Sequence, residues 1–418
     1  MSLNAERSYK MKLRDVENAF KYRRIPYPKR SVELIALLAI SCTFFLFMHT
    51  NKLNSRLKEM EVKLQPSEFS ALGITGNHIS GHDAGKHDDI NTLHGTYQYL
   101  KSTGQILQLS PEKLNNTPKA EIDVLFFNRV PKTGSMQLIE LMRQLGKVHN
   151  YDVEKDPQNG GVLPILEPAE ESDMIENIAS LEDGSAFASH VNFLNFTKHD
   201  QPRPIYINMV RDPVERVISW YYYIRAPWVF VPGRRRNNRE MPNPKWVNTE
   251  FDQCVLSGEK VCTYIENSLL EHVGDHRRQT LFFCGHNEAK CTPFNGRLPL
   301  QIAKMNVERE YSVVGTWEHT NETLAVLEAY VPRYFADASK MYYSGLHSDV
   351  QNSNPMKPHI PQNIIDMVRR NFTREIEFYQ FCRQHLHKQY IAIKLNELKK
   401  VDKSLAMMNE ANEMAIRD

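Results

Sequence analysis

Residues 122–135 read Ile122-Asp123-Val124-Leu125-Phe126-Phe127-Asn128-Arg129-Val130-Pro131-Lys132-Thr133-Gly134-Ser135. The first half of this stretch is a short, apolar, β-prone run that predicts a buried strand. Residues 136–145 follow with apolar side chains at helical spacing. A strand, a glycine-containing turn and a helix aim backbone N–H groups at one point. The stretch therefore predicts a binding site for a phosphate or sulfate group.

The turn itself contributes a cation and two hydroxyl groups, from Lys132, Thr133 and Ser135. The Walker A pattern is absent, because no glycine stands five residues before a Gly-Lys pair. A nucleoside triphosphatase, kinase or nucleotidase is therefore disfavoured. An ordinary surface loop is the alternative interpretation of the turn.

A second strand-to-helix junction lies about eighty positions later. Residues 205–210 predict a buried strand that leads into Arg211-Asp212-Pro213 and a helix from about residue 214. Asp212 suits the cap of that helix and Pro213 its first turn. The guanidinium of Arg211 and the hydroxyl of Ser219 can both bind a phosphate. Two such junctions predict a ligand that carries two separated anionic groups.

The composition excludes several classes of protein. The 418 residues are 41% hydrophobic and 24% charged, which excludes a disordered or fibrous chain. Lys and Arg total 52 against 50 Asp and Glu, a formal net charge of +2. A broad cationic surface for duplex nucleic acid is thereby excluded. An anionic partner must be bound by a local cluster of basic residues.

The N-terminal region predicts a membrane anchor. Nine of the first thirty residues are Lys or Arg, and residues 32–48 form an apolar stretch that only Glu33 interrupts. This length is at the lower edge of the roughly 17–25 residues that span a membrane. We expect a cytoplasmic tail at 1–31, a transmembrane signal-anchor at 32–49 and a lumenal remainder, in a single-pass type II arrangement. The short span favours a thin early-secretory or Golgi membrane over the thicker plasma membrane. A cleaved signal peptide is the alternative, but residues 47–50 offer no small-residue cleavage site.

A lumenal stem is expected at 50–119. Leu53, Leu57, Met60 and Leu64 follow the spacing of a short coiled coil at 53–64, or of a juxtamembrane helix without a partner. The scattered histidines of the stem predict solvated side chains rather than a zinc site. The main domain is expected at 120–390, followed by a polar, helical tail at 391–418. A homo-oligomer, either a dimer or a trimer, is a further expectation.

Several segments together resemble one known family. Val130–Ser135 looks like the 5′-phosphosulfate loop of sulfotransferases, and Arg211 through Ser219 looks like their 3′-phosphate site. Further likenesses occur at residues 128–132, 190–196, 204–208, 282–286 and 375–379. In this order the motifs resemble the uronyl 2-O-sulfotransferases, which include heparan sulfate 2-O-sulfotransferase, dermatan/chondroitin uronyl 2-O-sulfotransferase and insect Pipe. The resemblance covers roughly residues 120–390 and implies a P-loop-NTPase-like α/β fold with a central parallel sheet.

The resemblance also implies a donor, 3′-phosphoadenosine 5′-phosphosulfate, and no metal. It implies that Lys132 stabilises the departing bridging oxygen and that His190 is the general base. The residues expected to bind the donor are Lys132, Thr133, Gly134, Ser135, Met136, Arg211, Ser219 and Lys357. For His190 taken alone, a structural role is the alternative.

An acidic glycan acceptor needs cations and sugar contacts in the cleft. The resemblance assigns these contacts to Arg129, Trp220, Tyr222 and Arg236. It also assigns one to position 192, where this chain has Asn192 in place of the second histidine of the family's usual His-Val-His pattern, a departure that leaves the base intact but alters the expected acceptor positioning. Arg236 belongs to the basic run 234–236, for which a solvated face is the alternative. For Trp220 and Tyr222 the alternative is ordinary core packing.

The cysteines and sequons fit a secreted or lumenal environment. Cys254 and Cys262 are eight positions apart, and Cys284 and Cys291 are seven apart. Because no CxxC pair completes a zinc set, two local disulfides are preferred over a metal, and they agree with the family's pairs. Cys382 is expected to be a buried thiol. Glycosylation sequons begin at Asn115, Asn195, Asn321 and Asn371.

Two functional hypotheses follow. The preferred one is a Golgi sulfotransferase that transfers a sulfuryl group to the 2-hydroxyl of a hexuronic acid in a glycosaminoglycan or related glycan. Its rival is a catalytically inactive lumenal glycan-binding protein that retains the fold. The complete set Lys132, Arg211, Ser219 and His190 favours the enzyme, because a pure binding protein needs no complete donor site. The acceptor chain itself is left open.

Overall fold

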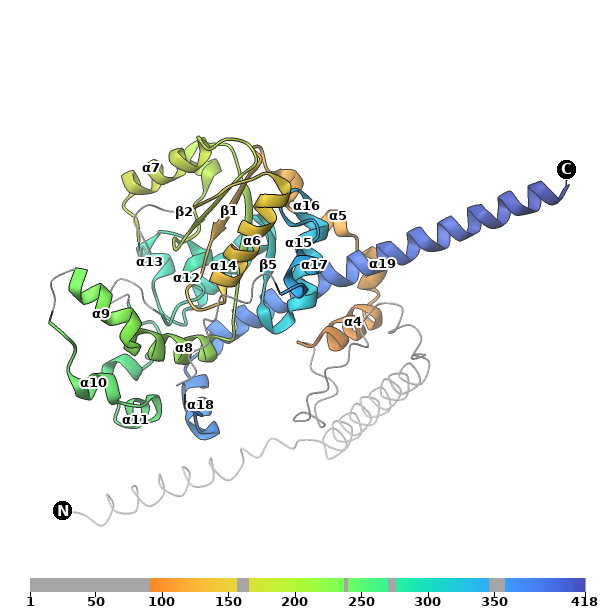
Figure 1. Cartoon of the computed structure of the whole chain (residues 1–418). Coiled ribbons are helices and arrows are strands. Elements are labelled where there is room, and N and C mark those ends of the chain that lie inside the picture. The colour runs from red at the N-terminus through yellow and green to blue at the C-terminus, as the bar shows by residue number, and fades with distance from the viewer. Residues whose placement is uncertain (1–90, 156–164, 237–239, 270–275, 346–357, 418) are drawn as a thin grey trace, which may run out of the picture. The chain divides into compact units, whose positions relative to one another are not determined.

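The computed structural model describes residues 91–155, 165–236, 240–269, 276–345 and 358–417 (Figure 1). The expected cytoplasmic tail, signal-anchor, coiled coil and Lys357 all lie outside these ranges. Among the described helices, none combines the length and the apolar character that crossing a membrane requires.

The centre of the protein is a five-stranded, wholly parallel sheet in the order β2-β3-β1-β4-β5. Its strands are β1 (Val124–Asn128), β2 (Val153–Lys155), β3 (Ser185–Ser189), β4 (Ile205–Met209) and β5 (Tyr311–Gly315). Every residue of β1, β4 and β5 is buried, as expected of strands that are covered on both faces. The predicted α/β class and the two predicted strands are therefore confirmed.

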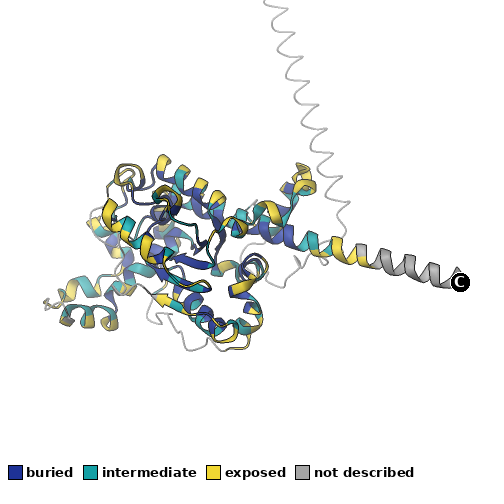
Figure 2. Ribbon diagram, turned by 90° about the horizontal axis from the view of Figure 1, so that it is seen from above, coloured by how far each residue is buried: buried dark blue, intermediate teal, exposed yellow. Residues whose placement is uncertain are grey.

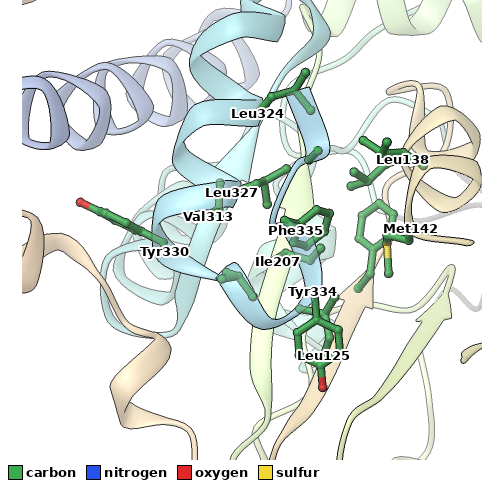
Figure 3. Packing of buried hydrophobic residues seen from close by; sticks show 14 of the residues in the cluster. Leu125, Leu138, Met142, Ile207, Val313, Leu324, Leu327, Tyr330, Tyr334 and Phe335 are labelled. Atoms are coloured by element: carbon green, nitrogen blue, oxygen red, sulfur yellow. The ribbon is translucent and has the colours of Figure 1, made fainter. Parts of the chain in front are cut away.

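One face of the sheet is covered by α6 (Ser135–His149), α15 (Thr320–Tyr330) and α16 (Pro332–Phe335). Successive strand residues point to opposite faces, so Leu125 and Phe127 of β1 belong to this core. Figure 3 shows how Leu125 and Ile207 pack with side chains of these helices.

The other face carries a separate core that includes Val124 and Phe126. Its helices are α7 (Pro168–Ala179), α12 (Leu281–Cys284) and α14 (Arg297–Arg309). The long helix α19 (Thr373–Arg417) contributes to both cores, with Phe378 on this side and Leu386 on the other. Figure 2 shows buried residues along the strands and along the part of α19 that packs against them.

Further helices complete the described part of the chain. They are α4 (Leu93–Ser102), α5 (Pro111–Leu114), α8 (Pro213–Arg225), α9 (Pro227–Arg236), α10 (Pro244–Asn248), α11 (Phe251–Leu256), α13 (Glu288–Cys291), α17 (Ala338–Tyr343), α18 (Gln362–Arg369), and the 3₁₀ turns η1 (Gln105–Gln108), η2 (Thr117–Lys119), η3 (Phe196–His199), η4 (Lys260–Cys262) and η5 (Trp317–His319).

Part of the expected stem packs on α19. Arg383 donates a hydrogen bond of 2.9 Å to the Asn91 carbonyl, and Gln389 donates one of 3.0 Å to the Leu114 carbonyl. The expected helical tail from residue 391 continues α19, whose residues 391–393 are buried. The domain limits at 119 and 390 remain predictions.

Both expected disulfides are present. Cys254 is bonded to Cys262 and Cys284 to Cys291, with Cα–Cα distances of 5.8 and 5.6 Å. Cys382 is a buried free thiol, and burial raises its pKa. The two local bridges and the buried thiol are thus confirmed.

Candidate active site

The site lies where β1 and β4 end, side by side in the sheet. Asn208 of β4 donates hydrogen bonds of 2.6 and 3.0 Å to the backbone and side-chain oxygens of Asn128 in β1. Both asparagines are fully buried, so these bonds fix how the ends of β1 and β4 are aligned with each other. These bonds thereby hold together the segments that follow the two strands, 129–135 and 210–213. Both segments lie at the carboxyl end of the sheet, where α/β proteins bind ligands.

The loop from Val130 to Ser135 forms the predicted tight turn. Lys132 and Gly134 have φ angles of 65° and 81°, in the left-handed region. The hydroxyl of Thr133 donates 2.9 Å to the Val130 carbonyl and stabilises the loop from within. Helix α6 begins at Ser135 without a side-chain cap from Gly134. Backbone N–H groups at this helix start can bind an anion, whereas the Thr133 hydroxyl is already engaged.

Lys132 is the central cation of the loop. Its ammonium lies 4.0 Å from the centre of the Tyr223 ring, on α8. Burial, and then the nearby charge of Arg211, lowers the Lys132 pKa to about 8. Sequence reasoning missed Tyr223, although its position four residues after Ser219 places both on one face of α8.

Arg211 joins the second junction to the loop. Its Nη1 donates 3.4 Å to the Lys132 carbonyl, and its Nη2 lies 3.5 Å from a Glu215 carboxylate oxygen. The side chain of Gln279 accepts from the Arg211 N–H at 3.0 Å and donates to its carbonyl at 3.1 Å. The two junctions therefore converge, as the sequence predicts.

The start of α8 matches its prediction. The Asp212 carboxylate accepts hydrogen bonds of 3.0 Å from the N–H groups of Val214 and Glu215, and Pro213 is the first helical residue. Ser219 lies two turns further along α8 and is half-buried.

His190 lies directly after β3 and beside the loop. Its Nδ1 is 2.9 Å from the Arg129 carbonyl. A carbonyl only accepts, so Nδ1 carries the proton and Nε2 has a free lone pair. Burial, followed by the charge of Arg129, lowers the His190 pKa to about 3. The imidazole is therefore neutral and has the tautomer that a general base requires.

Arg129 links His190 to the loop. Its backbone N–H donates 2.9 Å to the Ser189 carbonyl, and its guanidinium donates 3.1 Å to the sulfur of Met136. Burial lowers the Arg129 pKa to about 10. Lys132, Arg211, His190 and Arg129 are thus gathered at the end of β1.

The other expected acceptor contacts are not all drawn together. Asn192 is fully buried, so a direct contact with a glycan has no support from its position. The Tyr222 hydroxyl donates 2.8 Å to Glu250 and accepts from the Phe251 N–H at 3.2 Å, which favours a structural role. Trp220 is half-buried and stacks on the His276 ring at 6.0 Å. The side chain of Arg236, on α9, lies outside the described residues.

Within the described part of the chain, no group of three His, Cys, Asp or Glu side chains is arranged to hold a metal ion. Three sequon asparagines, Asn195, Asn321 and Asn371, are exposed. Asn115 is half-buried, and its amide contacts the Tyr330 carbonyl at 3.5 Å.

The protein has a parallel α/β fold, with a cationic, glycine-containing turn and a neutral histidine at the carboxyl end of its sheet. This arrangement is typical of a group-transfer enzyme that acts on an anionic donor. Residues 119–382 match the sulfotransferase family. The chain belongs to this family and is a sulfotransferase.

Individual relatives agree with this assignment. The chain is 45% identical to the uronyl 2-sulfotransferase homolog pip of Drosophila melanogaster, over 99% of each chain. It is 31% identical to heparan sulfate 2-O-sulfotransferase 1 of Xenopus laevis and of Homo sapiens, over 62% of this chain and 69% of each relative. The resemblance inferred from the sequence motifs is therefore confirmed.

Proposed function

We propose that this sulfotransferase transfers a sulfuryl group from 3′-phosphoadenosine 5′-phosphosulfate to the 2-hydroxyl of a hexuronic acid in a glycosaminoglycan. The observation that carries the proposal is the convergence of two anion-binding junctions on one neutral histidine. Arg211 contacts the Lys132 carbonyl, and His190 contacts the Arg129 carbonyl next to the same loop. The names of the relatives motivate the uronic acid acceptor.

The donor has two anionic ends. Backbone N–H groups of residues 133–136 and the Lys132 ammonium would bind its 5′-phosphosulfate, while Arg211 and Ser219 would bind its 3′-phosphate. Lys357 is proposed as an additional donor contact. Hydrogen bonds within the loop 130–135 and from Arg211 to the Lys132 carbonyl hold the loop before the reaction, so its amides stabilise developing charge without reorganising.

The reaction is an in-line displacement at sulfur. The acceptor oxygen forms a bond to sulfur while the bond from sulfur to the 5′-phosphate oxygen breaks. His190 Nε2 takes the hydroxyl proton, and Lys132 stabilises the negative charge on the departing phosphate. Arg129 and Arg236 would bind carboxylate or sulfate groups of the glycan, with Trp220 beside a sugar ring.

The test is to incubate the full chain with radiolabelled donor and a panel of heparan, dermatan and chondroitin chains. Products are then digested to disaccharides to locate the sulfate. His190→Ala and Lys132→Ala should reduce transfer by about 100-fold or more, whereas the matched controls His199→Ala and Lys198→Ala should not. Labelled 2-sulfated uronate supports the proposal. Binding of glycan without transfer to any acceptor would instead establish the rival glycan-binding function.

We also propose a single-pass type II protein of the Golgi membrane, with residues 1–31 cytoplasmic and the catalytic domain lumenal. The basic residues before the apolar stretch 32–48 support this orientation. The four sequons, at Asn115, Asn195, Asn321 and Asn371, are proposed to carry glycans. Endoglycosidase treatment should reduce the apparent mass of the cellular protein, and protease added to intact vesicles should remove only the N-terminal tail.

A dimer or trimer is proposed for the membrane-bound protein. The expected coiled coil at 53–64 motivates this state. Light scattering of the detergent-solubilised full chain, compared with a Leu57→Asp variant, tests it: a monomeric mass for both proteins contradicts the proposal.

A further inference from the structure

Trp317 follows β5, an edge strand of the sheet, and contacts the anion-binding loop that follows β1. It is the first residue of η5 and is separated from the end of β5 by Thr316 alone. Its indole N–H donates a hydrogen bond of 3.0 Å to the carbonyl of Gly134. The same carbonyl also accepts from the Gln137 N–H at 3.0 Å. A residue 183 positions away in the sequence thus contacts Gly134, the residue immediately before α6.

The contact leaves no room for a side chain at Gly134. A Cβ there would lie 2.1 Å from Cδ1 and 2.4 Å from Nε1 of Trp317. Gly134 therefore needs a glycine for two reasons, namely its left-handed φ of 81° and the indole beside it.

Two further interactions hold Trp317 in place, one on its indole ring and one on the backbone just before it. The Tyr342 ring of α17 stacks on the indole at 5.3 Å with an interplanar angle of 16°. At its base, the Thr316 N–H donates 3.0 Å to the Thr323 hydroxyl, which donates 2.8 Å back to the Thr316 carbonyl. Both threonines are fully buried. Trp317 is therefore attached to a rigid part of the core rather than to a mobile loop.

The hydrogen bond fixes the orientation of a peptide group. A trans peptide is planar, with its carbonyl and its N–H pointing in opposite directions. Because the Gly134 carbonyl points toward Trp317, the N–H of Ser135 points away from the indole. Ser135 begins α6 and is one of the residues whose amides would bind the donor.

We propose that Trp317 is a positioning residue for sulfuryl transfer, holding the Gly134–Ser135 peptide so that the loop amides face the 5′ end of the donor. The inference rests on the donor site of the proposed function. It adds a residue outside the loop that sets the loop's geometry. Misplacing a binding group by about 1 Å can slow such reactions by about 100-fold.

The first test compares Trp317→Phe with wild type. Phenylalanine keeps a ring against Tyr342 but cannot donate to Gly134. We expect the KM for the donor to rise about fivefold to tenfold, with the KM for the glycan unchanged. The matched control, Trp246→Phe on α10, should leave both constants unchanged. Equal donor KM values for wild type and Trp317→Phe would overturn the proposal.

The second test is a double-mutant cycle. Gly134→Ala in the wild-type background should lower kcat/KM for the donor by about 100-fold, because the methyl group displaces the indole. In a Trp317→Ala background the same substitution should cost less than about tenfold, the part due to the positive φ angle. Equal losses in the two backgrounds would show that the two residues act independently and would contradict the proposal.

A third measurement does not depend on the donor. Hydrogen exchange of peptides covering residues 129–138 should be faster in Trp317→Phe than in wild type, while exchange in β1 and β5 stays the same. Unchanged exchange in the loop would count against positioning whatever the activity. If wild type binds no adenosine 3′,5′-bisphosphate, the proposed donor fails, whereas the exchange result still decides the role of Trp317.

Discussion

The ammonium of Lys132 lies 4.0 Å from the centre of the Tyr223 ring, above the face of an exposed aromatic side chain. This contact matters because Lys132 is partly buried next to the cation Arg211, which disfavours its charged form. The negative face of an aromatic ring stabilises an ammonium by about 0.5–2 kcal/mol. Tyr223 therefore helps a buried lysine to remain charged before the donor arrives.

Replacing Tyr223 tests this relationship. Tyr223→Leu removes the aromatic face, and we expect kcat/KM for the donor to fall about threefold to tenfold, in line with a cation–π contact of moderate strength. Tyr223→Phe keeps the ring and should stay within about twofold of wild type. Initial rates at several donor concentrations measure the effect. A Tyr223→Leu protein with wild-type kinetics would show that the ring does not support Lys132.

The pKa of Lys132 predicts the alkaline limit of activity. Burial lowers this pKa to about 8, so the free enzyme loses the ammonium as the pH rises through about 8. Because kcat/KM reports groups of the free enzyme, it should fall above this pH. Because the His190 pKa is about 3, protonation of His190 should not change kcat/KM between pH 5 and pH 7. The Lys132→Arg variant should have low activity, but its kcat/KM should not fall above pH 8, since arginine stays protonated.

The sequence predicts the parts of this site that are encoded locally. The apolar runs before Lys132 and Arg211 and the capping signal at Asp212 each lie within a few residues, and the structure confirms the elements that they predict. The contact between Trp317 and Gly134 was not predictable, because it depends on β5 lying beside β4. The burial of Asn192 was not predictable either, because it depends on how segments distant in the sequence pack around a motif near the site.

Asp212 holds the start of α8 through both of its oxygens. One oxygen accepts from the Val214 and Glu215 N–H groups, and the other accepts two bonds of 3.1 Å from the Arg369 guanidinium. Asparagine at 212 keeps the cap but loses the charge pair, whereas alanine loses both. Arg369 is exposed enough that the pair itself contributes little, at most about 1 kcal/mol.

A ranking of variants follows from this geometry. Asp212→Asn and Arg369→Gln should each lower the free energy of unfolding by less than about 1 kcal/mol. Asp212→Ala should lower it by about 1–2 kcal/mol, because the helix cap is lost as well. Urea unfolding of the three variants measures the order. Equal losses for Asp212→Asn and Asp212→Ala would mean that the cap contributes nothing.

In the described part of the chain, five histidines whose pKa values are lowered predict that acid destabilises the fold. Burial lowers their pKa values from 6.5 to about 2–4, in His190, His276, His286, His385 and His387. Between pH 6.5 and these values the unfolded chain binds protons that the folded chain does not, so stability is lost as the pH falls. Each histidine should cost about 1.4 kcal/mol between pH 7.5 and pH 5.5.

His387 offers a direct test of this sensitivity. Its Nδ1 lies 3.3 Å from the Thr96 hydroxyl, and burial, then the charges of His319 and Arg383, lowers its pKa to about 2. His387→Asn keeps a polar atom near Thr96 but does not titrate. Urea unfolding of this variant should therefore lose about 1.4 kcal/mol less than wild type on going from pH 7.5 to pH 5.5. An identical loss in both proteins would show that His387 is not protonated on unfolding, and that the acid sensitivity has another origin.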